Sequence, residues 1–226
     1  MKKSLALTLA AAVLAALAAY AAFRAATTSV EETIEPLAIG SEVEDFTLID
    51  ARERQTASLG DYEEAAAFAL IFIGVECEAS NAYISRLSEL HEAYKQKGVQ
   101  FLAVNSNEEE MFSAVEAHAE AQQLPFPVLK DTNNALADQL KAVAAPEAFL
   151  IEPVRHETET GGKTVYILRY SGAVDDSEDS KEAKNHFLKE AIDALLSADS
   201  IVQKRVKPKG CPIDRVEKDA QPKATP

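Results

Sequence analysis

The stretch FIGVECEASNAY, residues 72–83, marks the point where a strand gives way to a helix. The apolar run AAAFALIFIGV leads into it and ends at Val75, which predicts a central strand covered on both faces. Beyond it, large side chains recur at helical spacing: Tyr83, Ile84, Leu87, Leu90 and Tyr94. Cys77 therefore lies at the corner between the strand and the helix.

On both sides of this corner, the sequence predicts further strands and helices. DFTLID (45–50) and VQFLAVNSN (99–107) are typical of strands, and PEAFLIEP (146–153) and KTVYILRY (163–170) predict a hairpin. Helices are expected around residues 106–123 and 134–143, and a last amphipathic helix is expected around 187–196. This order predicts an α/β domain with a central mixed sheet flanked by helices.

Length and charge limit the classes of function. The chain has 226 residues, 47% of them hydrophobic, which suits one core with appendages. Its net charge is −14, whereas nucleic acids and anionic lipids are bound by lysine and arginine. We expect no nucleic-acid partner.

The N-terminus has the features of an export signal. Lys2 and Lys3 precede an uncharged apolar run, and Ala19 and Ala21 suit cleavage after residue 21. The same run could instead stay as a membrane anchor, because about 20 apolar residues span a bilayer. Either alternative predicts an exported protein: periplasmic, membrane-anchored outside the cytoplasm, or secreted.

The expected organisation has four parts. Residues 1–21 are the signal peptide or anchor, and 22–38 lack periodicity and are expected to be a linker. Residues 39–198 are predicted to form the domain, and 199–226 a basic tail. The tail contains Cys211, and the chain has two cysteines, Cys77 and Cys211. In an oxidising compartment such a pair is a disulfide or a redox couple.

The order of these stretches resembles the thioredoxin fold. Over residues 39–196 it is most similar to the redoxin branch, which includes the alkyl hydroperoxide reductase/thiol-specific antioxidant proteins and exported thiol-disulfide oxidoreductases. The motifs that carry the resemblance are DFTLID, FIGVEC, FPVLKDTNNALADQL, APEAFLI and YSGAVDD. The resemblance implies that Cys77 is the nucleophile, with its thiolate stabilised by the helix N-terminus. It also implies that a cis Ala145-Pro146 bond offers the Ala145 backbone to a docking partner.

The sequence departs from the best-known branches of this superfamily. Ser80 stands where two-cysteine enzymes have their second cysteine, and Glu76 stands where they have tryptophan. Leu70 and Gly74 replace the proline and threonine of peroxiredoxins, and Asn81 excludes a copper-chaperone pattern. These positions support neither a local Cys-x-x-Cys exchanger nor a typical peroxidase.

The tail offers a second thiol. A glycine-cysteine pair recurs in C-terminal extensions of redoxin-like proteins, which implies that Cys211 acts together with Cys77. Glu76 and Glu78 oppose a thiolate at Cys77, whereas the basic residues of 204–209 favour one at Cys211. Our hypothesis is that the basic tail docks at this acidic site, forms a Cys77–Cys211 disulfide and supplies Cys211 as the resolving thiol.

The functional prediction is thiol-disulfide exchange or peroxide reduction, that is, antioxidant or oxidoreductase activity, through Cys77. Attack by its thiolate would give a mixed disulfide or a sulfenic acid, which Cys211 or an external thiol resolves. No bound cofactor is expected; the partners are a disulfide or peroxide substrate and an external thiol or thioredoxin-type reductant. The alternative is a non-catalytic binding module in which the two cysteines form a structural disulfide.

Other polar residues have structural interpretations. Ser106 and Glu109 predict a capping box, and Ser80 is expected in the first turn of its helix. The four histidines are expected at the surface and no metal site is predicted. The acidic stretch 175–179 lacks the pattern of a calcium loop and is expected to be solvated. Tyr83 and Tyr94 are expected in the core.

Overall fold

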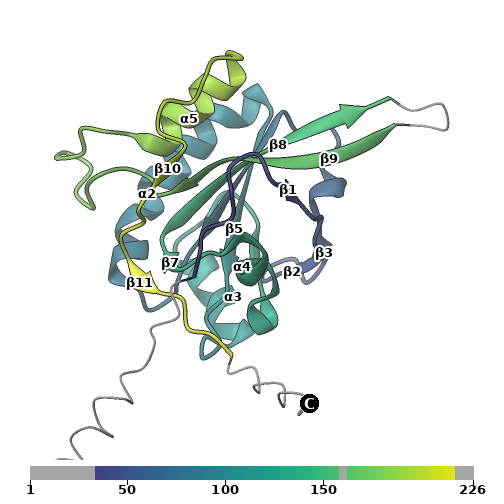
Figure 1. Cartoon of the computed structure of the whole chain (residues 1–226). Coiled ribbons are helices and arrows are strands. Elements are labelled where there is room, and N and C mark those ends of the chain that lie inside the picture. The colour runs from purple at the N-terminus through teal and green to yellow at the C-terminus, as the bar shows by residue number, and fades with distance from the viewer. Residues whose placement is uncertain (1–33, 158–161, 217–226) are drawn as a thin grey trace, which may run out of the picture. The chain divides into compact units, whose positions relative to one another are not determined.

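A mixed sheet forms the centre of the computed structural model, which describes residues 34–157 and 162–216. Its strand order is β1-β9-β8-β4-β5-β6-β2-β3, with β10 beside β9 (Figure 1). The strands of this sheet are β1 Glu42–Val43, β2 Leu48–Asp50, β3 Thr56–Ala57, β4 Ala67–Phe72, β5 Val99–Asn105, β6 Val128–Lys130, β8 Glu147–His156, β9 Lys163–Gly172 and β10 Arg205–Val206. A separate two-stranded sheet pairs β7 Ala144–Ala145 with β11 Cys211–Pro212. This confirms the predicted mixed sheet.

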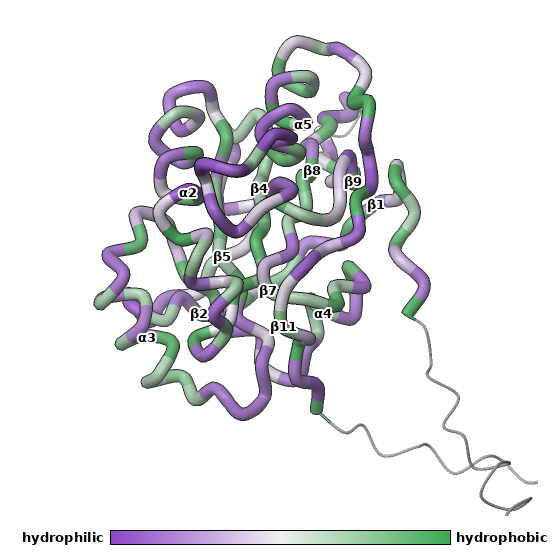
Figure 2. The backbone as a smooth tube through the Cα atoms, turned by 90° about the vertical axis from the view of Figure 1, so that its left-hand side faces the viewer, coloured by the Kyte–Doolittle hydropathy of each residue, from purple (hydrophilic) through white to green (hydrophobic). Residues whose placement is uncertain are grey.

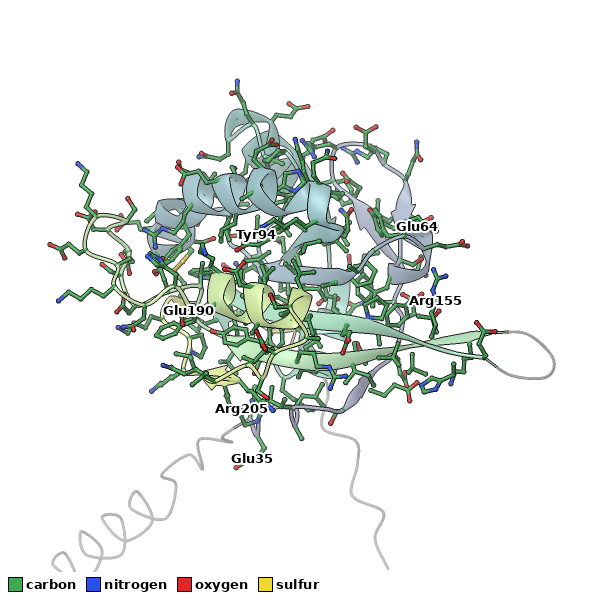
Figure 3. All side chains as sticks on the ribbon, turned by 90° about the horizontal axis from the view of Figure 1, so that it is seen from above. Glu35, Glu64, Tyr94, Arg155, Glu190 and Arg205 are labelled. Carbon is green, nitrogen blue, oxygen red and sulfur yellow. A yellow bond between two sulfur atoms is a disulfide. The ribbon has the colours of Figure 1, made fainter. Side chains whose placement is uncertain are left out.

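Helices flank the sheet. The α-helices are α2 Glu78–Tyr94, α3 Phe112–Ala121, α4 Ala135–Leu140 and α5 Phe187–Leu196. Short 3₁₀ helices are η1 Leu59–Asp61, η2 Lys95–Lys97 and η3 Thr132–Asn134. The β8 and β9 strands extend past their neighbours as a hairpin (Figure 1), and Arg155 lies towards the outer end of β8 (Figure 3).

Strand β4 is buried on both faces, as its apolar run predicts. It pairs in parallel with β5 and antiparallel with β8, so both of its edges are hydrogen-bonded. Ala67, Ala69 and Ile71 pack in the core that contains residues of α2, α3 and α5, whereas Phe68, Leu70 and Phe72 pack in the core that contains residues of α4. Hydrophobic residues are accordingly concentrated in the central strands (Figure 2). Because successive side chains of a strand point to opposite faces of the sheet, this single apolar run contributes residues to two cores.

The tyrosines of α2 are core residues, as expected. Tyr83 and Tyr94 are buried, and their hydroxyl groups donate to Asp175 Oδ1 at 2.8 Å and to Asp193 Oδ1 at 2.6 Å. Burial raises the pKa of both phenols, and the neighbouring carboxylates raise it further. These hydroxyl groups therefore stay protonated donors that link α2 to the chain after β9.

The predicted capping box at Ser106 is wrong. Helix α3 begins at Phe112, six residues later, and its N-terminus has no side-chain cap. The Ser106 hydroxyl instead donates to Asp131 Oδ2 at 2.6 Å, and both residues are buried. Because β5 and β6 end side by side, Ser106 is used to join the two strand ends, and the helix starts further along the chain.

The expectation of four surface histidines is wrong for two of them. His91 is half-buried, with its ring edge-on to Phe101 and Phe126 at centroid distances of 5.7 and 5.5 Å. His118 is also half-buried, and its Nε2 lies 2.7 Å from Asn81 Oδ1. Burial lowers the pKa of both rings, which favours the neutral form. Within 34–157 and 162–216, no group of three or more histidine, cysteine or acidic residues is placed to hold a metal ion.

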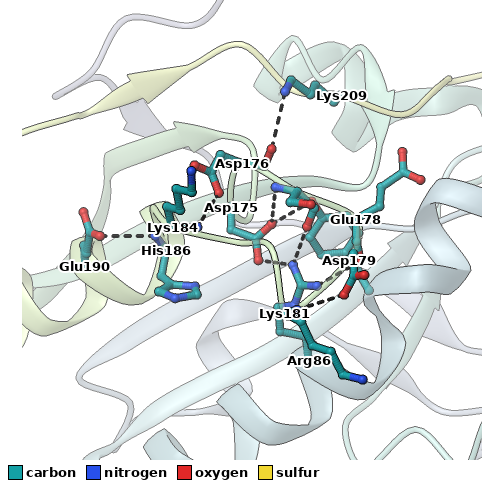
Figure 4. A network of polar contacts seen from close by, with 12 residues as sticks. Arg86, Asp175, Asp176, Glu178, Asp179, Lys181, Lys184, His186, Glu190 and Lys209 are labelled. Atoms are coloured by element: carbon teal, nitrogen blue, oxygen red, sulfur yellow. Dashed lines mark hydrogen bonds and ion pairs between the residues drawn. The ribbon is translucent and has the colours of Figure 1, made fainter.

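The acidic stretch after β9 is solvated only in part. Asp175 is buried and forms an ion pair with Arg86 of α2, which corrects the prediction of a solvated loop (Figure 4). The Arg86 guanidinium also donates to the carbonyl oxygens of Ser177 and Glu178, at 2.8 and 3.0 Å. A buried carboxylate needs such compensation, so the loop is fixed to α2.

The predicted leader, residues 1–21, and most of the predicted linker, 22–38, lie outside the described residues. In the part of the chain that is described, no helix has the length and hydrophobicity needed to cross a membrane.

Candidate functional site

The two cysteines form a disulfide. Cys77 Sγ and Cys211 Sγ are 2.01 Å apart and the Cα atoms 5.9 Å, although 134 residues separate them in sequence. Cys77 is 4% exposed, whereas Cys211 is partly exposed. The structure thus contains the hypothesised disulfide, with one buried and one more accessible sulfur.

Cys77 is the N-cap residue of α2. Its backbone is extended, with φ −87° and ψ 110°, and its Sγ accepts a hydrogen bond from the backbone N–H of Ser80 at 3.4 Å. Ser80 is in the first turn, as predicted, and its buried hydroxyl accepts from Gly74 N at 3.1 Å. Unpaired N–H groups and the positive end of the helix dipole stabilise a thiolate. The helix is therefore positioned to hold a negative charge on Cys77 after reduction.

The Ala145-Pro146 bond is cis and lies beside the disulfide. Ala145 O is 3.1 Å from Cys77 Sγ, and Cys211 is opposite Ala145 in the antiparallel β7–β11 pair. Ile213 N donates to Val143 O at 3.1 Å and continues this pairing. The structure therefore brings together Cys77, Cys211 and the Ala145 edge. The strand on that edge is the tail of the same chain.

The tail is held before Cys211 by strand β10. Arg205 and Val206 pair in parallel with Ser171 and Gly172 of β9, and Ser171 N donates to Lys204 O at 3.1 Å. Gly172 has φ +139°, and a Cβ there would lie 1.8 Å from Val206 O. A glycine is therefore required for the tail to approach this strand.

The tail is also held after Cys211. Asp214 N donates to Asn107 Oδ1 at 3.0 Å, and Glu108 N donates to Asp214 O at 3.2 Å. Val216 N donates to Asn134 Oδ1 at 2.7 Å. Because contacts flank Cys211 on both sides, its position does not depend on the disulfide alone.

The predicted electrostatic docking of the tail is wrong in its detail. Among the described residues, no ion pair joins the basic side chains of 204–209 to Glu76 or Glu78. Arg205 donates instead to Leu37 O, and Lys209 Nζ lies 3.5 Å from Asp176 O. Backbone pairing supplies the contacts, since exposed ion pairs contribute little in water.

Glu110 is a residue of the site that the sequence did not indicate. Its Oε1 accepts from Glu76 N at 3.0 Å, and its Oε2 accepts from the Asn105 side chain. Burial alone raises the pKa of Glu110, but hydrogen bonds from the backbone of Glu76 and Val75 and from the side chains of Asn105 and Asn107 outweigh this and lower it. An ionised carboxylate therefore holds the loop that leads into Cys77. In the sequence it was hidden in a run of glutamates.

Glu147, directly after the cis-proline, also escaped prediction. It is 5% exposed, and its Oε2 accepts from Val143 N at 2.7 Å and from Ala144 N at 3.2 Å. These two N–H groups belong to the segment that leads to Ala145, so Glu147 fixes the edge on which the tail pairs. A charged residue directly before the apolar run 148–151 was the available signal.

Replacing Glu147 by glutamine is expected to remove a pH dependence of stability. Burial raises the pKa of Glu147 above 4.5, although the N–H groups of Val143 and Ala144 partly oppose this. A raised carboxyl pKa gives stability that is present at pH values below 4.5 and is lost as the pH rises through the folded-state value. Urea unfolding between pH 4 and 8 should show the wild type losing stability relative to Glu147→Gln across this window. A constant difference between the two proteins would contradict the prediction.

The fold, this geometry and a match to a family model define a thioredoxin-fold protein of the redoxin type, with a cysteine at a helix N-terminus beside a cis-proline. The chain belongs to the AhpC/TSA family, because residues 39–172, more than half of the chain, match the model of that family.

Among curated proteins, the chain is similar to thiol-disulfide oxidoreductases named ResA. It is 33% identical over 116 residues to ResA of Geobacillus kaustophilus, an alignment that covers 51% of this chain and 64% of that protein. It is 26% identical over 155 residues to ResA of Bacillus thuringiensis subsp. konkukian, covering 69% and 79%. The chain thus spans slightly less than two thirds of the Geobacillus protein.

Solved structures show the same fold. A hypothetical protein from Sinorhizobium meliloti 1021 has a TM-score of 0.69 at 25% identity, covering 81% of this chain and 98% of that one. A protein assigned as thiol:disulfide interchange protein DsbE from Chlorobium tepidum has a TM-score of 0.51 at 20% identity, covering 71% and 99%. The second likeness shows the fold alone.

Proposed function

We propose that this protein is a thiol-dependent oxidoreductase that exchanges disulfides through Cys77 and Cys211. The observation that carries the proposal is the bond between a cysteine at a helix N-terminus and a second cysteine on a strand paired with the cis-proline edge. Its relatives are named thiol-disulfide oxidoreductases, which supports the same chemistry.

The reduced protein would act on a substrate disulfide. The Cys77 thiolate attacks one substrate sulfur, an S–S bond forms between them, and the other substrate sulfur leaves with the electron pair and takes up a proton. The Cys211 thiolate then attacks Cys77 Sγ, forms the intramolecular disulfide and releases the second substrate thiol. The substrate is reduced by two electrons and the protein is oxidised by two.

An external thiol or a thioredoxin-type reductant would then regenerate the dithiol. Cys77 is buried and Cys211 is partly exposed, so the reductant thiolate attacks Cys211 Sγ. Cys77 leaves as a thiolate, and the N–H of Ser80, 3.4 Å from its sulfur, stabilises that charge. A second reductant thiol releases Cys211. No bound cofactor enters either half of this cycle.

The contacts that anchor the tail support a role for Cys211 as the resolving thiol. Contacts of β10 with β9 and of Asp214 with Asn107 flank Cys211 on both sides. They retain the Cys211 thiol near Cys77 after reduction, which makes the second step intramolecular. We therefore expect short-lived mixed disulfides in the intact chain.

Peroxide reduction is a second candidate, favoured by the match to the AhpC/TSA family. The Cys77 thiolate would attack a peroxide oxygen, the O–O bond would break, and the other oxygen would leave with the electron pair as an alcohol or water after protonation, which gives a sulfenic acid. The Cys211 thiol would then attack Cys77 Sγ, form the Cys77–Cys211 disulfide and release water. Gly74 counts against efficient peroxide chemistry, because it supplies no hydroxyl group beside Cys77; a Cβ there would lie 3.0 Å from Asn107 Nδ2 and 3.1 Å from Cys77 Cβ, so a larger residue would require these side chains to shift. The two activities can be ranked by comparing the rate of peroxide consumption with the rate of insulin reduction, both with dithiothreitol as the electron donor.

We also propose that the protein acts outside the cytoplasm. The composition of residues 1–21 and a disulfide between the two cysteines of the chain support export. In the proposed organisation, the leader or anchor and a linker, 22–38, precede a redoxin domain, 39–198. The tail, 199–226, then supplies Cys211.

The reduction potential separates a catalytic disulfide from a structural one. We expect the wild-type protein to equilibrate with thiol redox buffers between about −270 and −120 mV, the range of thioredoxin-like catalysts. Thiol alkylation followed by mass spectrometry measures the reduced fraction. A value below about −300 mV, typical of structural disulfides, would favour the non-catalytic binding module.

A further inference from the structure

We infer that the Ala145 edge accepts peptide partners in which glycine directly precedes the reacting cysteine and an apolar residue follows two positions later. The inference rests on the proposed function and names the class of its substrate. The tail strand seated on this edge carries the argument.

Gly210 makes the closest approach to the edge. A Cβ on Gly210 would lie 2.1 Å from Ala145 O, 2.6 Å from Ala145 C and 2.9 Å from Pro146 N. All three are backbone atoms, and real Cβ atoms essentially never approach closer than 3.0 Å. A side chain at this position therefore requires the two backbones to separate.

The edge is not free to move away. Glu147 Oε2 holds Val143 N and Ala144 N, and Glu147 itself pairs with Phe72 in the central sheet. Because the Ala145 edge cannot shift, the docking strand must move away to relieve the steric clash, which weakens its pairing.

The register of the tail on this edge implies that other peptides also need a glycine at the position of Gly210. Cys211 is opposite Ala145, and Ala145 O is 3.1 Å from Cys77 Sγ. A peptide cysteine that bonds to Cys77 along this edge takes the place of Cys211, so the residue before it takes the place of Gly210. The edge thus requires the dipeptide Gly-Cys.

The positions after the cysteine differ in what they require. Pro212 is exposed and places no demand on the side chain. Ile213 is 8% exposed and packs in the core that contains Leu136 and Leu140 of α4. The recognised sequence is therefore Gly-Cys-x-apolar in an extended conformation.

The tail must leave the edge before such a peptide docks. In the full-length double variant Gly210→Ala/Cys211→Ala, the chain's own tail meets the clash at residue 210 and has no thiol. Both changes weaken the pairing of the tail with the Ala145 edge, so this edge is more accessible while Cys77 remains. This variant is the protein to test.

The probes are GCPI and ACPI peptides whose cysteines carry a thionitrobenzoate disulfide. The Cys77 thiolate attacks the peptide sulfur, the peptide-Cys77 bond forms, and thionitrobenzoate leaves with the electron pair and is followed by absorbance. We expect GCPI to react at least about tenfold faster than ACPI. Glutathione has no strand edge with which a peptide can pair, so it should react with both peptides at the same rate.

Equal rates for the two peptides at Cys77 would overturn the inference and leave the proposed function intact. Failure of Cys77 to react with either peptide or with free thionitrobenzoate disulfide would overturn the proposed function, and the inference with it.

A second measurement uses the chain's own tail. Gly210→Ala in the otherwise wild-type protein is expected to lower the equilibrium constant for the Cys77–Cys211 disulfide against glutathione by at least about tenfold. Gly162→Ala is the matched control, because among the described residues a Cβ there meets nothing closer than His156 O at 3.8 Å. An unchanged constant in Gly210→Ala, with the reduced variant melting like reduced wild type, would overturn the inference.

Discussion

Replacing Cys77 by serine is expected to abolish the protein's acceleration of insulin reduction by dithiothreitol, whereas reduced Cys211→Ser, mixed with insulin without any other thiol, should stop at a mixed disulfide. The reason is the difference between the two positions: Cys77 has the helix N-terminus to stabilise its thiolate, and Cys211 lies on an extended strand. Mass spectrometry should detect the trapped Cys77 adduct in Cys211→Ser.

The two variants control each other for stability. Both lose the same disulfide, which is expected to cost about 2–4 kcal/mol, or about 4–5 kcal/mol for so long a loop on the chain-entropy account. A difference in chemistry between them therefore cannot come from unfolding. If Cys77→Ser kept the parent's activity, the nucleophile would be wrongly assigned. If the parent were inactive with every thiol donor, the binding module would be the better description.

Replacing Arg86 by methionine is expected to cost about 3–5 kcal/mol of the free energy of unfolding, because it leaves a buried carboxylate without its cation. The Asp175 side chain is 1% exposed and the Arg86 side chain 11%. Tyr83 and the Ser177 backbone N–H still donate to Asp175, but neither carries a charge. Urea unfolding at pH 7 measures the loss.

Lys189→Met is the matched control. Lys189 also pairs with an aspartate, Asp193, but the two side chains are 50% and 44% exposed, so the loss should stay below about 1 kcal/mol. Arg86→Met/Asp175→Asn should recover part of the stability, since the amide keeps an acceptor without a buried charge. A single Arg86→Met variant as stable as the wild type would show that this ion pair does not fix the loop to α2.

The tail links these features to the proposed chemistry. Two glycines allow close backbone approach: Gly172 of β9 contacts Val206 of the tail, and Gly210 of the tail contacts Ala145. Such close contacts order the tail without bulky side chains. The resolving thiol is thereby supplied by a segment far from Cys77 in sequence, in a chain that has Ser80 where a local second cysteine would stand.

Much of the fold could be predicted because its signals are local. The apolar run up to Val75, the helical spacing after Cys77 and the hairpin from Glu147 each depend on neighbouring residues. The placement of Cys77 at the start of α2 follows from the same local pattern, and Pro146 was indicated by its place in the order of elements. The error at Ser106 came from a local pattern that a contact with Asp131 overrode.

The sequence by itself determined an α/β chain with a cysteine at a strand-to-helix corner, since hydrophobic periodicity records which face of each element is buried. Only the tertiary structure decided that Cys211 reaches Cys77, that Glu110 and Glu147 hold the two backbone segments beside them, and that Asp175 is buried against Arg86. The disulfide joins residues 134 positions apart, and the contacts of Glu110 and Arg86 join residues 34 and 89 positions apart, so all three depend on how the elements pack. Glu147 bonds residues only three and four positions before it, but its burial depends on the sheet around it. Glu110 lies in the sequence within a run of glutamates, and only its hydrogen bonds with the Glu76 backbone and the Asn105 side chain distinguish it from its neighbours.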